Sequence, residues 1–349
     1  MLRSPLSLPR AGVLAVGTLL LLVPLGHQQP EVKTRARVGK VSVAANKLDN
    51  DIIHRALLSH QAQNDIHGYP QFTAPYEAVG KSTERHKKKA KGAWTKPAYL
   101  LAVVVNELEK PEDERLEWIY WFDADTIVLN PETRLEVFLP PRDNSDLDDM
   151  HMLIASNWDG INSGAFALRV HPWTVSMLSA ILAYPIYKPE RVETDRFRDQ
   201  SAFHWLLEED DSPFSDTPTR GKEHWTFVPM RWFNSLPFNN PFDKKDGAWL
   251  VGKEMEENGL FDNGTTDVYD DGHGGQVQPW KVMQGDMVVH FAGCGTGKTR
   301  DSWMGPWLER AAAALPQWAN ATTQKDLEIE VTDFWKKDAE RVRALREGL

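Results

Sequence analysis

The chain has 349 residues, 41% of them hydrophobic, which is enough for one large α/β domain or two small ones. Its formal net charge of −10 argues against a nucleic-acid partner, because a phosphate backbone repels an acidic protein. Its single cysteine, Cys294, excludes an intrachain disulfide.

The N-terminus carries a short apolar segment. Residues 11–26 are uncharged and follow Arg3 and Arg10, the layout of a signal peptide or a short signal anchor. No A-x-A-like cleavage site follows, and thin early-secretory membranes accept short spans. We therefore expect residues 1–26 to be an uncleaved type II anchor with a lumenal C-terminus, and the polar, basic residues 27–37 to be a stem.

Strands alternate with helices over residues 38–349, which indicates the α/β class and one folded domain. The apolar segments predict strands at 38–45, 118–122, 152–156, 162–170 and 287–291. Amphipathic spacing and capping residues predict helices at 52–67, 94–107, 173–183 and 199–209, with a charged helix from Lys325 packing on the body. Loops are expected at 143–149, 210–222 and 239–276, the first of them a solvated acidic turn.

The most informative segment is WIYWFDADTIVLN, residues 118–130, in which a bulky apolar strand stops on Asp123-Ala124-Asp125. If the backbone stays extended there, Asp123 and Asp125 point to the same side. Two carboxylates at the end of a buried strand need a cation between them, and Mg²⁺ or Mn²⁺ prefers such oxygen ligands. The pattern therefore predicts a metal–diphosphate site, although a short Asp-x-Asp is also common in solvated turns.

Two other enzyme classes share parts of this pattern. Haloacid-dehalogenase-like phosphatases also place Asp-x-Asp after an apolar strand, with the first Asp as nucleophile, but Ile127 stands where their fifth position carries Thr or Val. AGCGTGKT at 292–299 resembles a phosphate-binding P-loop, yet it begins with Ala and only about fifty residues follow it. We interpret it as a loop in which Lys298 is a candidate for phosphate contact.

Further polar residues lie at strand and helix ends. His290 ends the strand 287–291, and imidazole with two carboxylates makes a workable divalent-cation site. Asp159 to Gly164, DGINSG, precedes or begins a strand, and Asp199-Gln200-Ser201 opens a helix. Each is also compatible with a simple cap or turn.

The order of motifs resembles glycosyltransferase family 34, which includes fungal α-1,2-galactosyltransferases, subunits of α-1,6-mannosyltransferase complexes and plant xyloglucan xylosyltransferases. The matching stretches run from about residue 50 to 310, and they resemble the fungal members more than the plant members. They are His67-Gly68-Tyr69, Trp94-Thr95-Lys96-Pro97, WIYWFDADTIVLNP, DGINSGAFALR, DQSAFHWLLEE, FVPMRWFNSLPF, and GDMVVHFAGC followed by Trp307.

The resemblance implies a GT-A fold, one Rossmann-like domain with a mixed central sheet. It also implies transfer of a hexose, with retention of configuration, from a nucleotide sugar (UDP-galactose or GDP-mannose) to a mannose-containing glycan. The site residues that it implies are Asp123, Asp125 and His290 for Mn²⁺ or Mg²⁺; Lys96, Asp159, Asn162, Gly164 and Lys298 for the donor; and Asp199, Gln200 and Asp159 for catalysis.

Three points stay open from the sequence. Retention proceeds either by front-face attack or through a carboxylate nucleophile, for which Asp199 is the candidate. The competing functions are a non-catalytic subunit of a mannosyltransferase complex and the phosphatase. The location implied is the Golgi membrane, and association with another copy or another subunit is compatible with the sequence.

Overall fold

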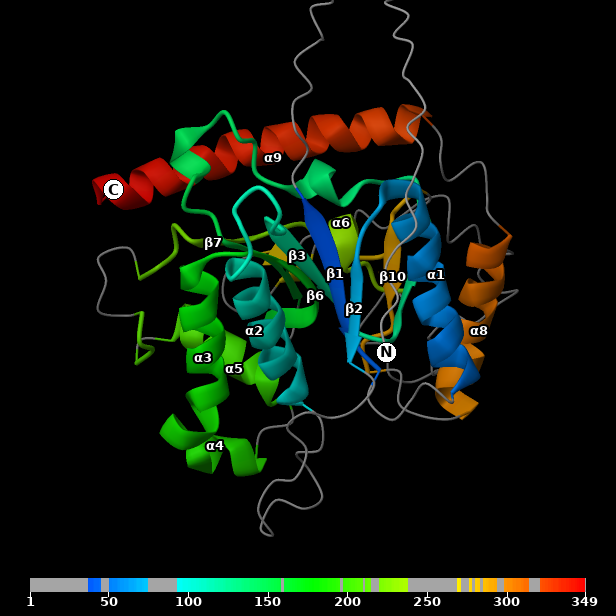
Figure 1. Ribbon diagram of the computed structural model, residues 1–349, viewed down its shortest axis with the longest axis horizontal. Helices are drawn as coiled ribbons and strands as arrows, with labels where there is room; N and C mark the ends of the chain where they lie inside the picture. The colour runs from blue at the N-terminus through cyan, green and yellow to red at the C-terminus, as the bar shows by residue number, and fades with distance from the viewer. Residues whose placement is uncertain are drawn as a thin grey trace, which may run out of the picture. The chain divides into compact units, whose positions relative to one another are not determined.

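The core of the protein is a six-stranded sheet in the order β2-β1-β3-β6-β5-β7 (Figure 1). Its strands are β1 (Val38–Val43), β2 (Gln71–Ala74), β3 (Trp118–Phe122), β5 (Met152–Asn157), β6 (Gly160–Arg169) and β7 (Trp225–Phe227). β1 is parallel to β2 and β3, β6 is antiparallel to β3 and β5, and β7 is parallel to β5. The predicted α/β class with a mixed central sheet is therefore confirmed.

The computed structural model describes residues 37–44, 50–74, 93–157, 160–194, 197–209, 211–214, 220–237, 269–270, 276–277, 280–282, 285–293, 298–313 and 321–348. Ala36–Leu349 forms one compact unit. The predicted anchor at 1–26 and nearly all of the predicted stem lie outside the described residues. Among the helices that are described, none has the length and apolar character needed to cross a bilayer.

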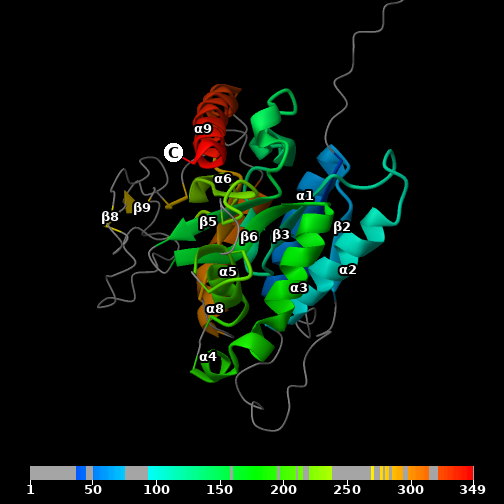
Figure 2. The same ribbon diagram turned by 90° about the vertical axis from the view of Figure 1, so that its left-hand side faces the viewer.

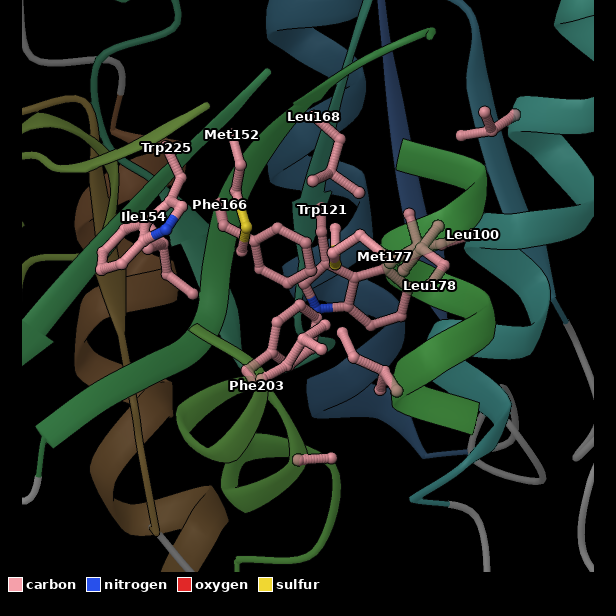
Figure 3. Close-up of a cluster of buried hydrophobic side chains, with 14 of the residues drawn as sticks. Leu100, Trp121, Met152, Ile154, Phe166, Leu168, Met177, Leu178, Phe203 and Trp225 are labelled. Carbon is pink, nitrogen blue, oxygen red and sulfur yellow. The ribbon is translucent and has the colours of Figure 1, made fainter. Parts of the chain in front are cut away.

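Alternate residues of β3 enter two different cores, because both faces of the sheet are covered. Ile119 and Trp121 face three helices, α2 (Thr95–Leu108), α3 (Pro172–Tyr187) and α5 (Asp199–Glu208). Figure 3 shows the Trp121 indole among Phe166 of β6, Met177 of α3 and Phe203 of α5. This packing brings the first turns of α2 and α5 to the carboxyl end of β3.

The opposite face of the sheet is covered by short elements and the C-terminal helix (Figure 2). They are η2 (Leu135–Phe138), η3 (Ser145–Leu147), α6 (Met230–Phe233) and α9 (Ala321–Glu347). Trp335 of α9 donates its indole N–H to the Phe138 carbonyl at 3.2 Å, so the predicted packing of the tail helix is confirmed.

The acidic segment 143–149 is largely exposed, as predicted, but it also contacts the C-terminal helix. Asp146 pairs with Arg343 at 2.5 Å, and Asp149 pairs with Arg346 at 3.0 Å. The two arginines lie three residues apart on one face of α9, a spacing that the isolated acidic segment does not reveal.

A smaller unit carries the histidine of the candidate site. β4 (Thr126–Val128) pairs antiparallel with β10 (Val288–His290), and both pack against α1 (Asp51–His67) and α8 (Lys298–Ala312). α1 ends as predicted, with Gly68 in the left-handed region at φ 77°. The remaining described elements are α4 (Pro189–Thr194) and a two-stranded pair, β8 (Tyr269–Asp270) and β9 (Gln276–Val277).

Three histidines stack where α3 begins. The rings of His151 and His171 lie 4.0 Å apart between centroids, and those of His151 and His224 lie 5.3 Å apart. Burial lowers the pKa of His151 from 6.5 to about 2, and the neighbouring His171, Arg169 and His224 add to the effect. His151 therefore stays neutral in the folded protein at acidic pH.

We expect this cluster to make the fold sensitive to acid. Below its ordinary pKa of 6.5, His151 gains a proton only in the unfolded chain, so stability is lost as pH falls from 6.5 toward 2. The loss per histidine approaches about 1.4 kcal/mol per pH unit. His151→Phe should flatten the dependence of unfolding free energy on pH between 7 and 5 in urea titrations, whereas His54→Gln on the exposed side of α1 should not. An unchanged slope in His151→Phe would contradict this account.

Candidate active site

Asp123 and Asp125 lie in a turn between β3 and β4 at the carboxyl end of the central sheet. The Asp123 carbonyl accepts hydrogen bonds from the Thr126 amide at 3.1 Å and the Thr126 hydroxyl at 2.7 Å. The prediction that both carboxylates project from one extended strand is therefore wrong, because the chain reverses between them. The turn and β10 nevertheless bring both carboxylates to the same site.

β10 brings His290 to the two carboxylates. His290 is paired with Thr126 across the β4–β10 ladder, and the Phe291 amide donates to the Asp125 carbonyl at 3.0 Å. Nε2 of the buried His290 ring lies 3.6 Å from Oδ1 of Asp125. Asp123, Asp125 and His290 each offer one ligand atom, and these atoms all lie within 4.8 Å of one another.

This donor set fits a divalent cation. Carboxylate oxygens suit Mg²⁺ and Mn²⁺, and an imidazole nitrogen adds preference for a transition metal. Asp123 and Asp125 are partly exposed, so the donors face an accessible site rather than a sealed core. Asp123, Asp125 and His290, the predicted ligands, are thus brought together by the fold.

A largely buried lysine, with 11% of its side chain exposed, neutralises the carboxylates on the other side of the site. Lys96, in the first turn of α2, lies with Nζ 3.0 Å from Oδ1 of Asp123 and 3.2 Å from Oδ2 of Asp199. The same ammonium donates to the Ser163 carbonyl at 2.8 Å and lies 5.2 Å from the centre of the Trp121 ring. Burial lowers the pKa of Lys96, but Asp123 and Asp199 outweigh it, and the net pKa is raised. The lysine is therefore a permanent cation that bridges two acids.

Asp199 and Gln200 open α5 beside this lysine. Burial raises the pKa of the Asp199 carboxyl, opposed by Lys96 and reinforced by Asp123. Oδ1 of Asp123 also accepts the Trp121 indole N–H at 2.8 Å, and Oε1 of Gln200 accepts the Ser163 amide at 3.2 Å. The residue before Asp199, Arg198, has a positive φ of 48°, a conformation that few non-glycine residues adopt and that is enriched at functional sites.

A bulge in β6 forms the floor of the site. Ile154 of β5 pairs with Phe166, but the next residue pairs with Asn162, so the intervening Ser163, Gly164 and Ala165 leave the β5–β6 ladder. The Gly164 carbonyl accepts the Asp123 amide at 2.8 Å, which fixes the bulge to the carboxyl end of β3.

Gly164 is placed directly under His290. A Cβ added at Gly164 would lie 1.9 Å from Cε1 of the imidazole, so only glycine permits this approach. The sequence predicted Gly164 as a donor-binding residue, a role that stays a prediction. Its contact with His290 was not predicted.

The other predicted residues divide into two groups. Lys96 and Asn162 lie at the site, and their contact with the donor stays a prediction. Asp159 lies outside the described residues, and so does the side chain of Lys298, whose backbone begins α8. The described residues after 298 form only α8 and α9, without the parallel strands of a P-loop fold. Sequence reasoning missed two residues of the site. They are Asn234, whose side chain contacts His290 and Asn162, and Ser163, whose carbonyl accepts from Lys96.

A model of the galactosyl transferase GMA12/MNN10 family matches residues 140–301. The resemblance to glycosyltransferase family 34 is confirmed. The family 34 match contains His290, Asp199 and the β6 bulge, and Asp123 and Asp125 lie just before it.

Two proteins similar to this chain carry related descriptions. An uncharacterized alpha-1,2-galactosyltransferase of Schizosaccharomyces pombe is 22% identical over 222 residues, which cover 56% of this chain and 45% of that protein. The match thus spans less than half the length of the relative. Among solved structures, a glycosyltransferase involved in the glycosylation of the major capsid of PBCV-1 is similar with a TM-score of 0.47 and 12% identity, over 77% of this chain and 98% of that one.

Proposed function

We propose that the chain is a metal-dependent, retaining glycosyltransferase that moves a hexose from a nucleotide sugar to a mannose-containing glycan in α linkage. The observation that carries the proposal is the convergence of Asp123, Asp125 and His290 at one site. The two aspartates precede the family 34 match, and the histidine lies within it. The descriptions of the matched family and of the S. pombe relative favour galactose, and hence UDP-galactose, over GDP-mannose.

The three ligands would hold Mn²⁺ or Mg²⁺ at the donor diphosphate, where the ion supplies Lewis-acid stabilisation of the leaving nucleoside diphosphate. Lys96 keeps the carboxylates of Asp123 and Asp199 oriented while it neutralises them. We assign Asp199 and Gln200 to the reacting face of the sugar, since both begin the helix that meets the bulge next to Asp123.

This arrangement favours a transferase over the phosphatase. The matched family is one of galactosyl transferases, and its match includes Asp199 and His290, for which the phosphatase hypothesis has no role. A non-catalytic subunit has no need of a complete ligand set, a buried lysine between two acids and a strained residue beside them.

Titration calorimetry tests the proposal. UDP-galactose, GDP-mannose and their nucleoside diphosphates are titrated into the full chain in detergent, with and without Mn²⁺. We expect Mn²⁺-dependent binding of the uridine nucleotides and, with a mannose-containing acceptor, transfer of galactose with retained configuration. Binding of neither nucleotide to folded protein, or trapping of an aspartyl-phosphate on Asp123, would overturn the proposal.

We also propose a Golgi membrane location with a lumenal catalytic domain. The support is the apolar segment 11–26 after Arg3 and Arg10, together with sequons at Asn263 and Asn320. Glycosidase treatment should increase the gel mobility of the chain made in a fungal host, and an unmodified, membrane-free chain would contradict the proposal.

A further inference from the structure

Asn234, the residue that follows α6, is fully buried between β6 and the His290 ring. Its Nδ2 faces three acceptors: Oδ1 of Asn162 at 3.0 Å, the Asn162 carbonyl at 3.4 Å and the Ala165 carbonyl at 3.5 Å. Its Oδ1 lies 2.8 Å from Nδ1 of His290. Because an amide nitrogen only donates and an amide oxygen only accepts, these neighbours fix which way the Asn234 side chain points.

The orientation of Asn234 determines the tautomer of His290. The amide oxygen cannot donate, so Nδ1 of His290 must carry the ring proton in the 2.8 Å contact. In a neutral imidazole the other nitrogen then holds a lone pair, and this nitrogen, Nε2, is the one that lies 3.6 Å from Oδ1 of Asp125. The ring therefore presents a ligand atom to the other two candidate ligands.

Residue 234 holds the side chain of His290, and residue 235 holds its main chain. The Ser235 carbonyl accepts the His290 amide at 2.7 Å, while the Asn234 side chain holds the ring. Oδ1 of Asn162, to which Asn234 donates, also accepts the Gly164 amide at 3.0 Å. Asn234 is thus bonded at one end to the bulge of β6 and at the other to His290, the candidate metal ligand.

We propose that Asn234 is a positioning residue that locks His290 in the Nδ1–H tautomer and couples the metal ligand to the donor-side bulge of β6. Its part in metal binding rests on the proposed function. Outer partners of this kind orient the ring and raise ligand basicity, and their removal typically costs about 10- to 100-fold in metal affinity.

The first test needs no variant. In the full chain labelled with ¹⁵N-histidine and free of metal, long-range ¹H–¹⁵N spectra report which nitrogen of His290 is protonated, with His290→Gln used to assign the signal. We expect the Nδ1–H pattern in the wild type and a mixture of tautomers in Asn234→Ala. An Nε2–H pattern in the wild type, or an unchanged pattern in Asn234→Ala, would overturn the proposal.

The second test measures Mn²⁺ affinity by electron paramagnetic resonance of the free ion. Asn234→Ala should weaken binding about tenfold or more. Thr174→Ala is the matched control, since Thr174 is equally buried and its hydroxyl donates to the Arg169 carbonyl rather than contacting the imidazole. Equal Mn²⁺ affinity in the wild type and in a folded Asn234→Ala would overturn the proposed coupling between Asn234 and metal binding by His290. A wild type that shows the Nδ1–H tautomer but binds no Mn²⁺ would sink the proposed function and support the assignment of Asn234.

Discussion

Asp125→Ala should abolish metal-dependent donor binding while leaving the fold intact. Asp125 is a quarter exposed and lies in a turn, so its removal opens no cavity in the core. Its carboxylate supplies one of the three ligand atoms that lie within 4.8 Å of one another. Loss of one preorganised electrostatic group typically costs about 10²- to 10³-fold in turnover. Mn²⁺ affinity and initial rates of sugar transfer check the expectation.

A carboxylate away from the site provides the control. Asp65 is exposed on α1 and makes one hydrogen bond, to Gln61 on the same helix. Asp65→Ala removes the same chemical group and the same unit of charge, so it should change neither Mn²⁺ affinity nor rate by more than about twofold. Transfer at the wild-type rate by Asp125→Ala would remove the metal site from the proposed mechanism.

The sequence predicted four of the six strands of the central sheet, β1, β3, β5 and β6, because strand signals are local. The run from Trp118 to Phe122 is apolar on both faces, and such a run forms a strand covered on both sides. The same property hides which residues face which core, since Tyr120 and Trp121 are equally apolar. The short elements β7 and α6 were missed because three or four residues show no periodicity.

The sequence predicted the part of the site in which the type of side chain alone identifies a candidate metal ligand. The side chains of Asp123, Asp125 and His290 are of types that bind divalent cations, and the structure brings them together although the histidine is far away in the sequence. The turn between the two aspartates was not predicted, because it depends on bonds from the Thr126 amide and hydroxyl. Asn234 was inaccessible to sequence reasoning, since an asparagine after a short apolar segment also fits an ordinary cap.

The glycine under His290 ties the geometry of the bulge to the candidate metal site. Its substitution should move the His290 ring while the protein still folds. Gly164→Ala would put a methyl group 1.9 Å from Cε1 of His290 and 2.6 Å from both ring nitrogens. Overpacking of a buried site typically costs about 1–3 kcal/mol of stability. The ring cannot yield without breaking its bond to Asn234 or moving Nε2 away from Asp125. We therefore expect Mn²⁺ affinity to fall by more than tenfold in a protein that still folds.

Gly39→Ala in β1 is the matched substitution, because this glycine also lies within a strand and its added Cβ would meet the end of a flexible side chain, Cδ1 of Leu116, at 2.6 Å. It should lower the free energy of unfolding, measured in urea, without changing Mn²⁺ affinity. The comparison is decisive because both variants carry a steric cost in the sheet and only Gly164→Ala displaces a ligand. If Gly164→Ala kept wild-type affinity while Gly39→Ala behaved as expected, Nε2 of His290 would not be a metal ligand, and the site would reduce to its two aspartates.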